Sequence, residues 1–149
     1  MIQTETVNPT NMSLGQFRRE VLGDYRLALV SRQCSQAGRK EVLTGKAKFG
    51  IFGDGKELAQ IAYARQFKEG DWRSGYYRDQ TFMMASGLLT IEEFFAQLYG
   101  TTDDKVNPGN AGRSFNNHFA TRNIDEQGIW LDLTRQKNSA ADLSPTAGH

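Results

Sequence analysis

The chain has 149 residues, of which 18 are basic and 17 acidic, and its formal net charge is +1. The length suits one domain or part of one, and the balanced charge gives no reason to expect a nucleic acid or an anionic membrane surface as partner. A single cysteine, Cys34, excludes an internal disulfide bond, and no apolar run approaches the roughly 20 residues that span a bilayer. Residues 1–12 form a polar, loose tail without a secretory signal core, so we expect a protein of the cytoplasm.

The first predicted element is a long helix. Ser13 followed by Gln16 is a capping box, in which each residue bonds the backbone of the other. Apolar residues then recur at helical spacing from Leu14 to Leu29, and Gly45 is typical of a position just past a helix end. We therefore predict one helix that begins after Ser13 and ends before Gly45.

A glycine-rich loop follows at residues 45–55. It contains Phe49 and Phe52, which we expect to act either as a buried anchor or as a wall that faces a ligand. At the end of this loop Asp54 is expected to cap a helix, with Glu57 completing a capping box.

Four shorter elements are predicted next. Residues 57–67 are apolar on most sides, which is typical of a buried helix. Residues 72–76 suit a short extended piece, and residues 81–86 suit a short helix. Thr90 followed by Glu93 is a third capping box and opens a further helix. The apolar face of that helix consists of Ile91, Phe94, Phe95, Leu98 and Tyr99.

Tyr77 and Arg78 are the first candidates for a binding site. They follow Gly75 and precede an apolar segment. Arginine offers a flat fork of donors for phosphate or carboxylate oxygens, and tyrosine offers a ring that packs and a hydroxyl that bonds. The pair therefore suits the wall of a pocket for a flat anionic ligand. A half-buried strand with a solvated arginine is the alternative interpretation.

Regular signals fade in the last third of the chain. Residues 107–112 have the composition of a flexible loop, and residues 123–133 suit a turn around Gly128. His118, between them, is either a structural residue or a ligand-binding one. Ser144 before a proline is typical of a helix start. Because a complete domain rarely stops there, we expect the N-terminal segment of a longer enzyme.

Five segments of the chain form a recognisable series. They are Gly53-Asp54-Gly55-Lys56-Glu57, Tyr77-Arg78, the helix from Leu89 to Gly100, Ala111-Gly112-Arg113 with His118, and Leu143-Ser144-Pro145. In this order they resemble the alpha part of the thiamine-diphosphate-dependent 2-oxo acid dehydrogenases, the first enzymes of the 2-oxo acid complexes. The resemblance runs from about Asp24 to the last residue. The branched-chain type of this family fits best, through Gly112-Arg113 with His118 and through the Ala96-Gln97-Leu98-Tyr99 helix.

The resemblance implies an α/β thiamine-diphosphate-binding fold, here incomplete. Most of the family's sheet lies downstream, so the segment itself should be mainly α-helical with short extended pieces. Residues 13–149 would be the N-terminal segment of the dehydrogenase domain, truncated at the start of a helix. The parent would be either a separate alpha chain or an alpha–beta fusion enzyme.

The resemblance also implies contacts with the cofactor, thiamine diphosphate with Mg²⁺. By carry-over, Tyr77, Arg78, His118, Ser144 and Thr146 bind this cofactor, and no residue of the segment is itself catalytic. Gly53-Asp54-Gly55 begins like the family's metal motif, but the next asparagine is Asn107, roughly twice the family's spacing away. The metal ligands are therefore expected outside this segment.

The implied reaction is oxidative decarboxylation of a branched-chain 2-oxo acid, with acyl transfer to a lipoyl group. Implied partners are the beta part of the enzyme, which carries the activating carboxylate, and a lipoyl-bearing acyltransferase. The segment alone would be inactive. The alternative from a different class is a non-catalytic helical interaction module, in which Phe49, Phe52 and Trp130 bind a partner protein.

Overall fold

The computed structural model describes residues 12–108, 110–113 and 119–140. Helices supply most of their regular structure, and the strands form one two-stranded parallel sheet. The prediction of a mainly helical segment with short extended pieces is therefore confirmed. In chain order the elements are α1 (Leu14–Leu43), α2 (Glu57–Ala64), β1 (Trp72–Ser74), α3 (Gln80–Ala85), α4 (Ile91–Leu98), the 3₁₀ helix η2 (Leu133–Arg135) and β2 (Asn138–Ala140).

Two of the three predicted capping boxes are confirmed. The Ser13 hydroxyl accepts the Gln16 N–H at 3.3 Å, and the Gln16 side chain accepts the Ser13 N–H at 2.9 Å. Thr90 and Glu93 exchange the same pair of bonds at 3.1 and 2.7 Å. Gly45, just beyond α1, has φ 75°, a conformation that favours glycine. Local chemistry thus sets these helix ends.

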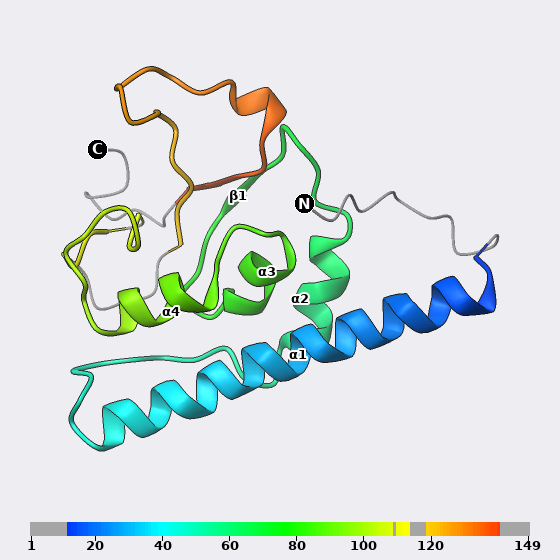
Figure 1. The fold of residues 1–149 in the computed structure, drawn as a ribbon, viewed down its shortest axis with the longest axis horizontal. Coiled ribbons are helices and arrows are strands. Elements are labelled where there is room, and N and C mark those ends of the chain that lie inside the picture. Colours follow the sequence, from blue (N-terminus) through cyan, green and yellow to red (C-terminus); the bar gives the residue numbers. More distant parts are fainter. Residues whose placement is uncertain (1–11, 109, 114–118, 141–149) are drawn as a thin grey trace.

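Helix α1 lies along one side of the molecule, with α2, α3 and α4 packed on it (Figure 1). The core between them contains Cys34, and burial raises the pKa of its thiol. Phe52 packs against this core as a partly buried anchor. The buried core residues are Cys34, Ala64, Phe67, Phe82, Met83, Leu89, Phe94 and Phe119.

The strands β1 and β2 pair in parallel, with Arg73 opposite Ser139. Parallel strands need a long crossover, and α3, α4 and the following loops provide it. The sheet lies on the far side of α3 and α4 from α1 (Figure 1). Beyond it, the predicted turn around Gly128 is confirmed, since Gly128 has φ 80° and donates to the Asp125 carbonyl oxygen at 3.2 Å.

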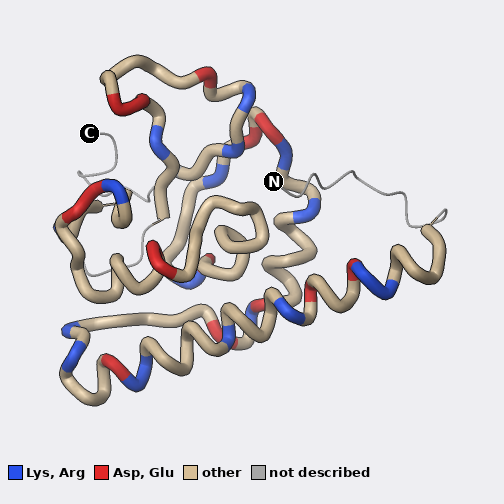
Figure 2. Tube along the Cα trace, in the orientation of Figure 1, with Lys and Arg blue, Asp and Glu red and all other residues tan. Residues whose placement is uncertain are grey.

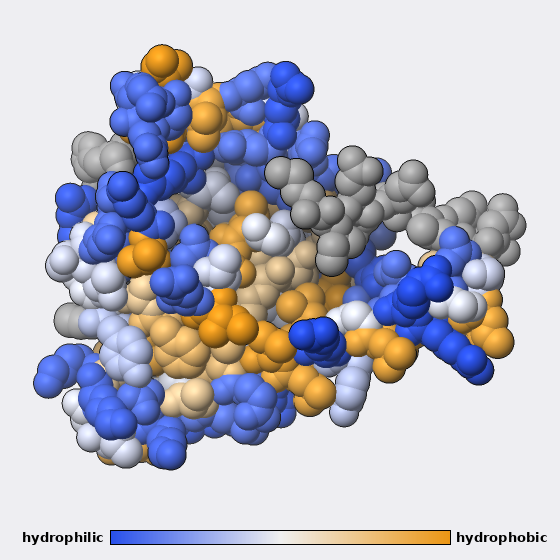
Figure 3. Space-filling model, viewed as in Figure 1, coloured by the Kyte–Doolittle hydropathy of each residue, from blue (hydrophilic) through white to orange (hydrophobic). Residues whose placement is uncertain are grey.

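The large apolar side chains of α1 face solvent, because the helix turns its small residues to the core. Ser31, Ser35 and Gly38 are buried. The first half of α1 projects past α2, and the space-filling view shows apolar patches between hydrophilic ones along it (Figures 1 and 3). Its exposed apolar side chains are Leu14, Phe17, Val21, Leu22, Tyr25 and Leu29, here called the outer face of α1.

One expectation about an apolar face is wrong. Helix α2 is not buried on most sides, since Leu58 is 74% and Tyr63 61% exposed. Among the described elements, its main packing partners are α1 and α3, and the side that carries Leu58 and Tyr63 faces water. The predicted apolar face of α4 packs within the chain through Phe94 and Leu98, which are buried.

Basic and acidic residues are interspersed along the described chain, in keeping with the near-neutral net charge (Figure 2). Among the described residues, no helix is both long and apolar enough to cross a membrane.

Candidate functional site

Tyr77 and Arg78 lie on a tight turn between β1 and α3. The Asp79 N–H donates to the Tyr76 carbonyl oxygen at 3.1 Å, as in a β-turn. The Asp79 carboxylate closes the turn a second time, because its Oδ2 accepts the Tyr76 N–H at 3.0 Å. These residues therefore lie on a turn, and their interpretation as part of a strand is wrong.

A buried arginine braces this turn. Arg73 of β1 is 7% exposed, and its Nη2 donates to Asp79 Oδ2 at 2.5 Å, a charge-assisted bond. Its Nη1 donates to Ser139 Oγ of β2 at 2.7 Å. A Cβ atom at Gly75 would lie 2.6 Å from the guanidinium, so glycine makes room for it. One side chain thus ties both strands to the turn.

The backbone of Arg78 is held from the side of α2. Gln60 Nε2 donates to the Arg78 carbonyl oxygen at 2.9 Å. A Cβ atom at Gly53 would overlap that oxygen and lie 3.0 Å from the carbonyl carbon, so only glycine fits there. Arg78 is consequently fixed between α2 and the loop that precedes α2.

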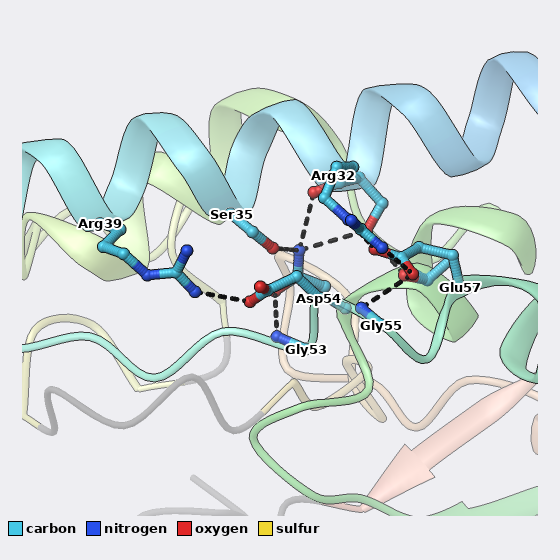
Figure 4. A network of polar contacts seen from close by, with 10 residues as sticks. Arg32, Ser35, Arg39, Gly53, Asp54, Gly55 and Glu57 are labelled. Atoms are coloured by element: carbon cyan, nitrogen blue, oxygen red, sulfur yellow. Dashed lines mark hydrogen bonds and ion pairs between the residues drawn. The ribbon is translucent and has the colours of Figure 1, made fainter.

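A buried polar cluster ties α3 to α1 beside the same loop (Figure 4). Gln80 is fully buried, and its Nε2 donates to the Ser31 carbonyl oxygen at 3.0 Å and to Ser35 Oγ at 2.8 Å. Its Oε1 accepts the Gly53 N–H at 3.2 Å. Because these groups satisfy one another away from water, the cluster fixes the position of the Gly53 backbone.

Asp54 and Glu57 pair with α1, so their predicted roles in capping α2 are wrong. Arg32 donates from Nε and Nη2 to the two Glu57 carboxylate oxygens at 2.6 and 2.9 Å. Arg39 Nη2 donates to Asp54 Oδ1 at 2.8 Å (Figure 4). Helix α2 instead begins after Lys56 without a side-chain cap. The arginines of α1 lie within reach of both carboxylates, and charge-assisted pairing prevails over local capping.

The Arg32 fork holds the pKa of the buried Glu57 carboxyl below its usual range, and the Gly55 N–H, which donates to it at 2.9 Å, adds to this. The folded-state pKa is thus lower than the unfolded value of about 4.3. The pair therefore contributes stability at pH values above the unfolded pKa, and this is lost as pH falls through the folded pKa.

We expect Glu57→Gln to test this linkage. The variant should be less stable than the wild type at pH 7, because a neutral amide loses the ion pair with Arg32. The two unfolding free energies should converge below pH 4, where the wild-type carboxyl becomes protonated. Urea unfolding from pH 7 to pH 2.5 measures the difference. A difference that stays constant with pH would contradict the assignment.

The side chains of the turn stack on one another. The rings of Tyr76 and Tyr77 lie 4.0 Å apart between centroids, and their hydroxyl oxygens are 2.6 Å apart. The Arg78 guanidinium lies 5.3 Å from the centre of the Tyr77 ring. Tyr77 and Arg78 are half-buried, so each presents polar atoms at a surface braced from within.

The Arg78 guanidinium has unused hydrogen-bonding capacity. Its Nε is buried and, within the described part of the chain, has no hydrogen-bond partner. A buried donor without a partner costs about 1–3 kcal/mol, which an arriving acceptor would recover. No described carboxylate forms an ion pair with Arg78, so its charge is available. The donor set fits an anion with several oxygens, such as a diphosphate.

His118, Ser144 and Thr146 lie outside the described residues, and all five predicted cofactor contacts, Tyr77 and Arg78 included, stay predictions. Within the described ranges, no group of three or more His, Cys, Asp and Glu side chains is placed to hold a metal ion. A surface hollow of about 300 Å³ lies elsewhere, bordered by Glu93, Arg122 and other residues.

The residues that hold the turn were not among the candidates that the sequence offered. Arg73, Asp79 and Gln60 bond across elements that are far apart in the sequence, and no local pattern names their partners. Gln60 offered one signal, as a polar residue within an otherwise apolar helix.

Comparison with known proteins gives one match. The family model described as dehydrogenase E1 component matches residues 25–129, which include Tyr77, Arg78 and His118. No curated protein and no solved structure matches the chain. The matched range covers well over half of the sequence and both braces of the Tyr77–Arg78 turn at Gln60 and Asp79. The chain belongs to the dehydrogenase E1 component family.

Proposed function

We propose that this chain is the alpha-type part of a thiamine-diphosphate-dependent 2-oxo acid dehydrogenase, with the corresponding α/β cofactor-binding fold. The observation that carries the proposal is the braced turn, which presents Arg78 beside Tyr77 with a buried Nε that has no hydrogen-bond partner among the described residues. Family membership adds the reaction class. When bound, thiamine diphosphate with its Mg²⁺ supplies the electron sink for decarboxylation, and the protein supplies position and charge.

In this proposal Arg78 binds diphosphate oxygens through its guanidinium. The Tyr77 ring lies against that guanidinium and limits its rotation, which lowers the entropy lost on binding. Arg73 and Asp79 keep the turn in place without touching the cofactor. His118, Ser144 and Thr146, assigned by resemblance, complete the contacts from this chain, and the metal ligands come from outside it.

We assign a branched-chain 2-oxo acid as substrate, on the resemblance of Gly112-Arg113 and of the helix around Ala96. The acyl group then passes to lipoyl on an acyltransferase in the cytoplasm. A beta part provides the activating carboxylate. The outer face of α1 supports such a partner: it is apolar and exposed, and none of Arg18, Arg19 and Arg26 forms an ion pair within the described residues.

Decarboxylation by the assembled enzyme tests the proposal. The chain combined with its beta part should release CO₂ from 2-oxoisovalerate only when thiamine diphosphate and Mg²⁺ are present, and more slowly from pyruvate. Leaving out the cofactor is the control. An assembled enzyme that binds the cofactor and releases CO₂ from no 2-oxo acid would contradict the reaction. Faster turnover of pyruvate would contradict the branched-chain assignment.

The second candidate is a non-catalytic interaction module. Its support is exposed aromatic surface, since Trp130 is 72% and Phe49 41% exposed. Phe52 does not belong to that surface, because its ring packs against Phe94 at 6.2 Å and against Gly38 of α1. Trp130→Ala separates the two candidates: it should leave CO₂ release unchanged in a dehydrogenase and should weaken partner binding in a module.

A further inference from the structure

We propose that Gln60 is a positioning residue, which sets the place of Arg78 by clamping its carbonyl group. The proposal rests on the proposed function, because it assigns to Arg78 the task of binding the cofactor. It depends on two hydrogen bonds made by the Gln60 side-chain amide and on the role of Asp79, which these bonds leave free to close the turn.

The Gln60 amide bonds to the backbone at both ends of the segment from Arg78 to Phe82. Its Nε2 donates to the Arg78 carbonyl oxygen at 2.9 Å, and its Oε1 accepts the Phe82 N–H at 3.0 Å. Gln60 belongs to α2, whereas Arg78 is in the turn and Phe82 is in α3. Since both polar atoms of the amide are used, neither a hydrocarbon nor a carboxylate of the same length can reproduce the pair of bonds.

The bond to Phe82 replaces a missing helix cap. The first N–H groups of a helix have no partner within the helix, and the residue before it usually accepts one of them. Asp79 holds that position for α3, but its side chain makes no capping bond. Its carboxylate accepts instead from Tyr76 and Arg73. Gln60 therefore caps α3 from another helix and leaves Asp79 free to close the turn.

The clamp leaves Arg78 little room to move. Its carbonyl oxygen lies between the Gln60 amide and the Cα of Gly53, where a Cβ would overlap it. Gly53 is itself held by Gln80 at 3.2 Å. Since a side chain starts from its own backbone, fixing this peptide group fixes the origin of the Arg78 guanidinium. Preorganisation of this kind raises affinity by removing an ordering cost.

Gln60→Glu is the sharpest variant, because a carboxylate can accept from Phe82 but cannot donate to Arg78. In the assembled enzyme at pH 7 we expect a roughly tenfold rise in the Kd of thiamine diphosphate, the size of one lost hydrogen bond. The kcat at saturating cofactor should stay within about twofold. Gln66→Glu, at an exposed position, is the matched control and should leave both constants unchanged.

Acidification provides a rescue that a general loss of stability would not show. Once protonated, the carboxyl group that Gln60→Glu introduces can donate to the Arg78 oxygen and accept from Phe82, as the native amide does. The Kd ratio of Gln60→Glu to wild type should therefore approach one near pH 4. Gln60→Met loses both bonds and cannot be protonated, so its Kd ratio to wild type should be the same at both pH values. This variant also tests the clamp if Gln60→Glu fails to fold.

A spectroscopic readout on the chain alone separates the clamp from the proposed function. In Gln60→Glu the carbonyl ¹³C resonance of Arg78 should shift at pH 7 and return at pH 4. The hydrogen-exchange rate of the Phe82 amide should stay that of the wild type, because its bond to residue 60 is kept. An unmoved Arg78 resonance, or a Kd equal to that of the wild type, overturns the clamp. If the wild-type enzyme binds no thiamine diphosphate, the proposed function fails, and the Arg78 resonance still decides the clamp.

Discussion

Gly53→Ala is expected to destabilise the chain by about 3 kcal/mol, the upper end for overpacking a fixed site. The added Cβ would overlap the Arg78 carbonyl oxygen and lie 3.0 Å from the carbonyl carbon, and both are backbone atoms. The loop cannot retreat at low cost, because the Gly53 N–H donates to the buried Gln80 amide at 3.2 Å. Relief therefore requires breaking that bond or moving the Arg78 turn.

Urea unfolding of the variant and the wild type at pH 7 measures this cost. Gly23→Ala is the control, because a Cβ at this position in α1 meets nothing within 4 Å. That change should stabilise by about 0.5–1 kcal/mol, since alanine favours a helix interior. A Gly53→Ala chain within about 0.5 kcal/mol of the wild type would show that the loop is not pinned against the turn.

The sequence predicted those features that depend on neighbouring residues. Ser13 with Gln16 and Thr90 with Glu93 were recognised as helix starts because each pair is complete within one turn of chain. Gly45 marked a helix end for the same reason, since its positive φ is a local property. Helix ends follow from such signals even when the packing is unknown.

Pairing across the chain could not be predicted in this way. Asp54 has the correct spacing for a cap, yet it pairs with Arg39, an element away. The same holds for Glu57 and Arg32. Several arginines precede the loop, and spacing does not select among them. A local signal gives what a side chain can do, and the tertiary fold decides which partner it meets.

Helical periodicity also cannot tell which apolar stripe meets the core. In α1 the conspicuous stripe faces solvent, whereas the buried side uses Ser31, Ser35 and Gly38. Small residues allow close approach, so a packed face need not be a strongly apolar one. The large apolar side chains of the outer face of α1 stay exposed in the described structure. In the proposed enzyme the beta part would cover them.

The candidate site likewise combines residues that the local sequence indicates with residues that only the tertiary fold brings together. Tyr77 and Arg78 are candidates from the sequence because the two residue types are adjacent and chemically distinctive. Gln60, Arg73 and Asp79, which fix them, bond over longer separations and gave no comparable signal. His118, Ser144 and Thr146 remain predictions from resemblance.

Arg78→Ala is expected to cost about 2–5 kcal/mol of thiamine diphosphate binding in the assembled enzyme, the range for removing one partner of a desolvated charge pair. This corresponds to a Kd raised roughly thirtyfold to several thousandfold. Arg78→Lys should recover only part of the loss, because a point charge cannot make the forked contact. The buried Nε of Arg78, which has no described partner, marks the donor that lysine lacks.

Cofactor titration calorimetry and turnover at rising thiamine diphosphate measure these effects together. Saturating cofactor should restore turnover in Arg78→Ala, since the residue contributes binding and the cofactor supplies the chemistry. Arg135→Ala, at an exposed position in η2, is the control and should change the Kd by less than twofold. If Arg78 is only a solvated arginine on a turn, both of its substitutions will stay within about 0.5 kcal/mol of the wild type. An unchanged cofactor affinity in Arg78→Ala would remove the central residue of the proposed site.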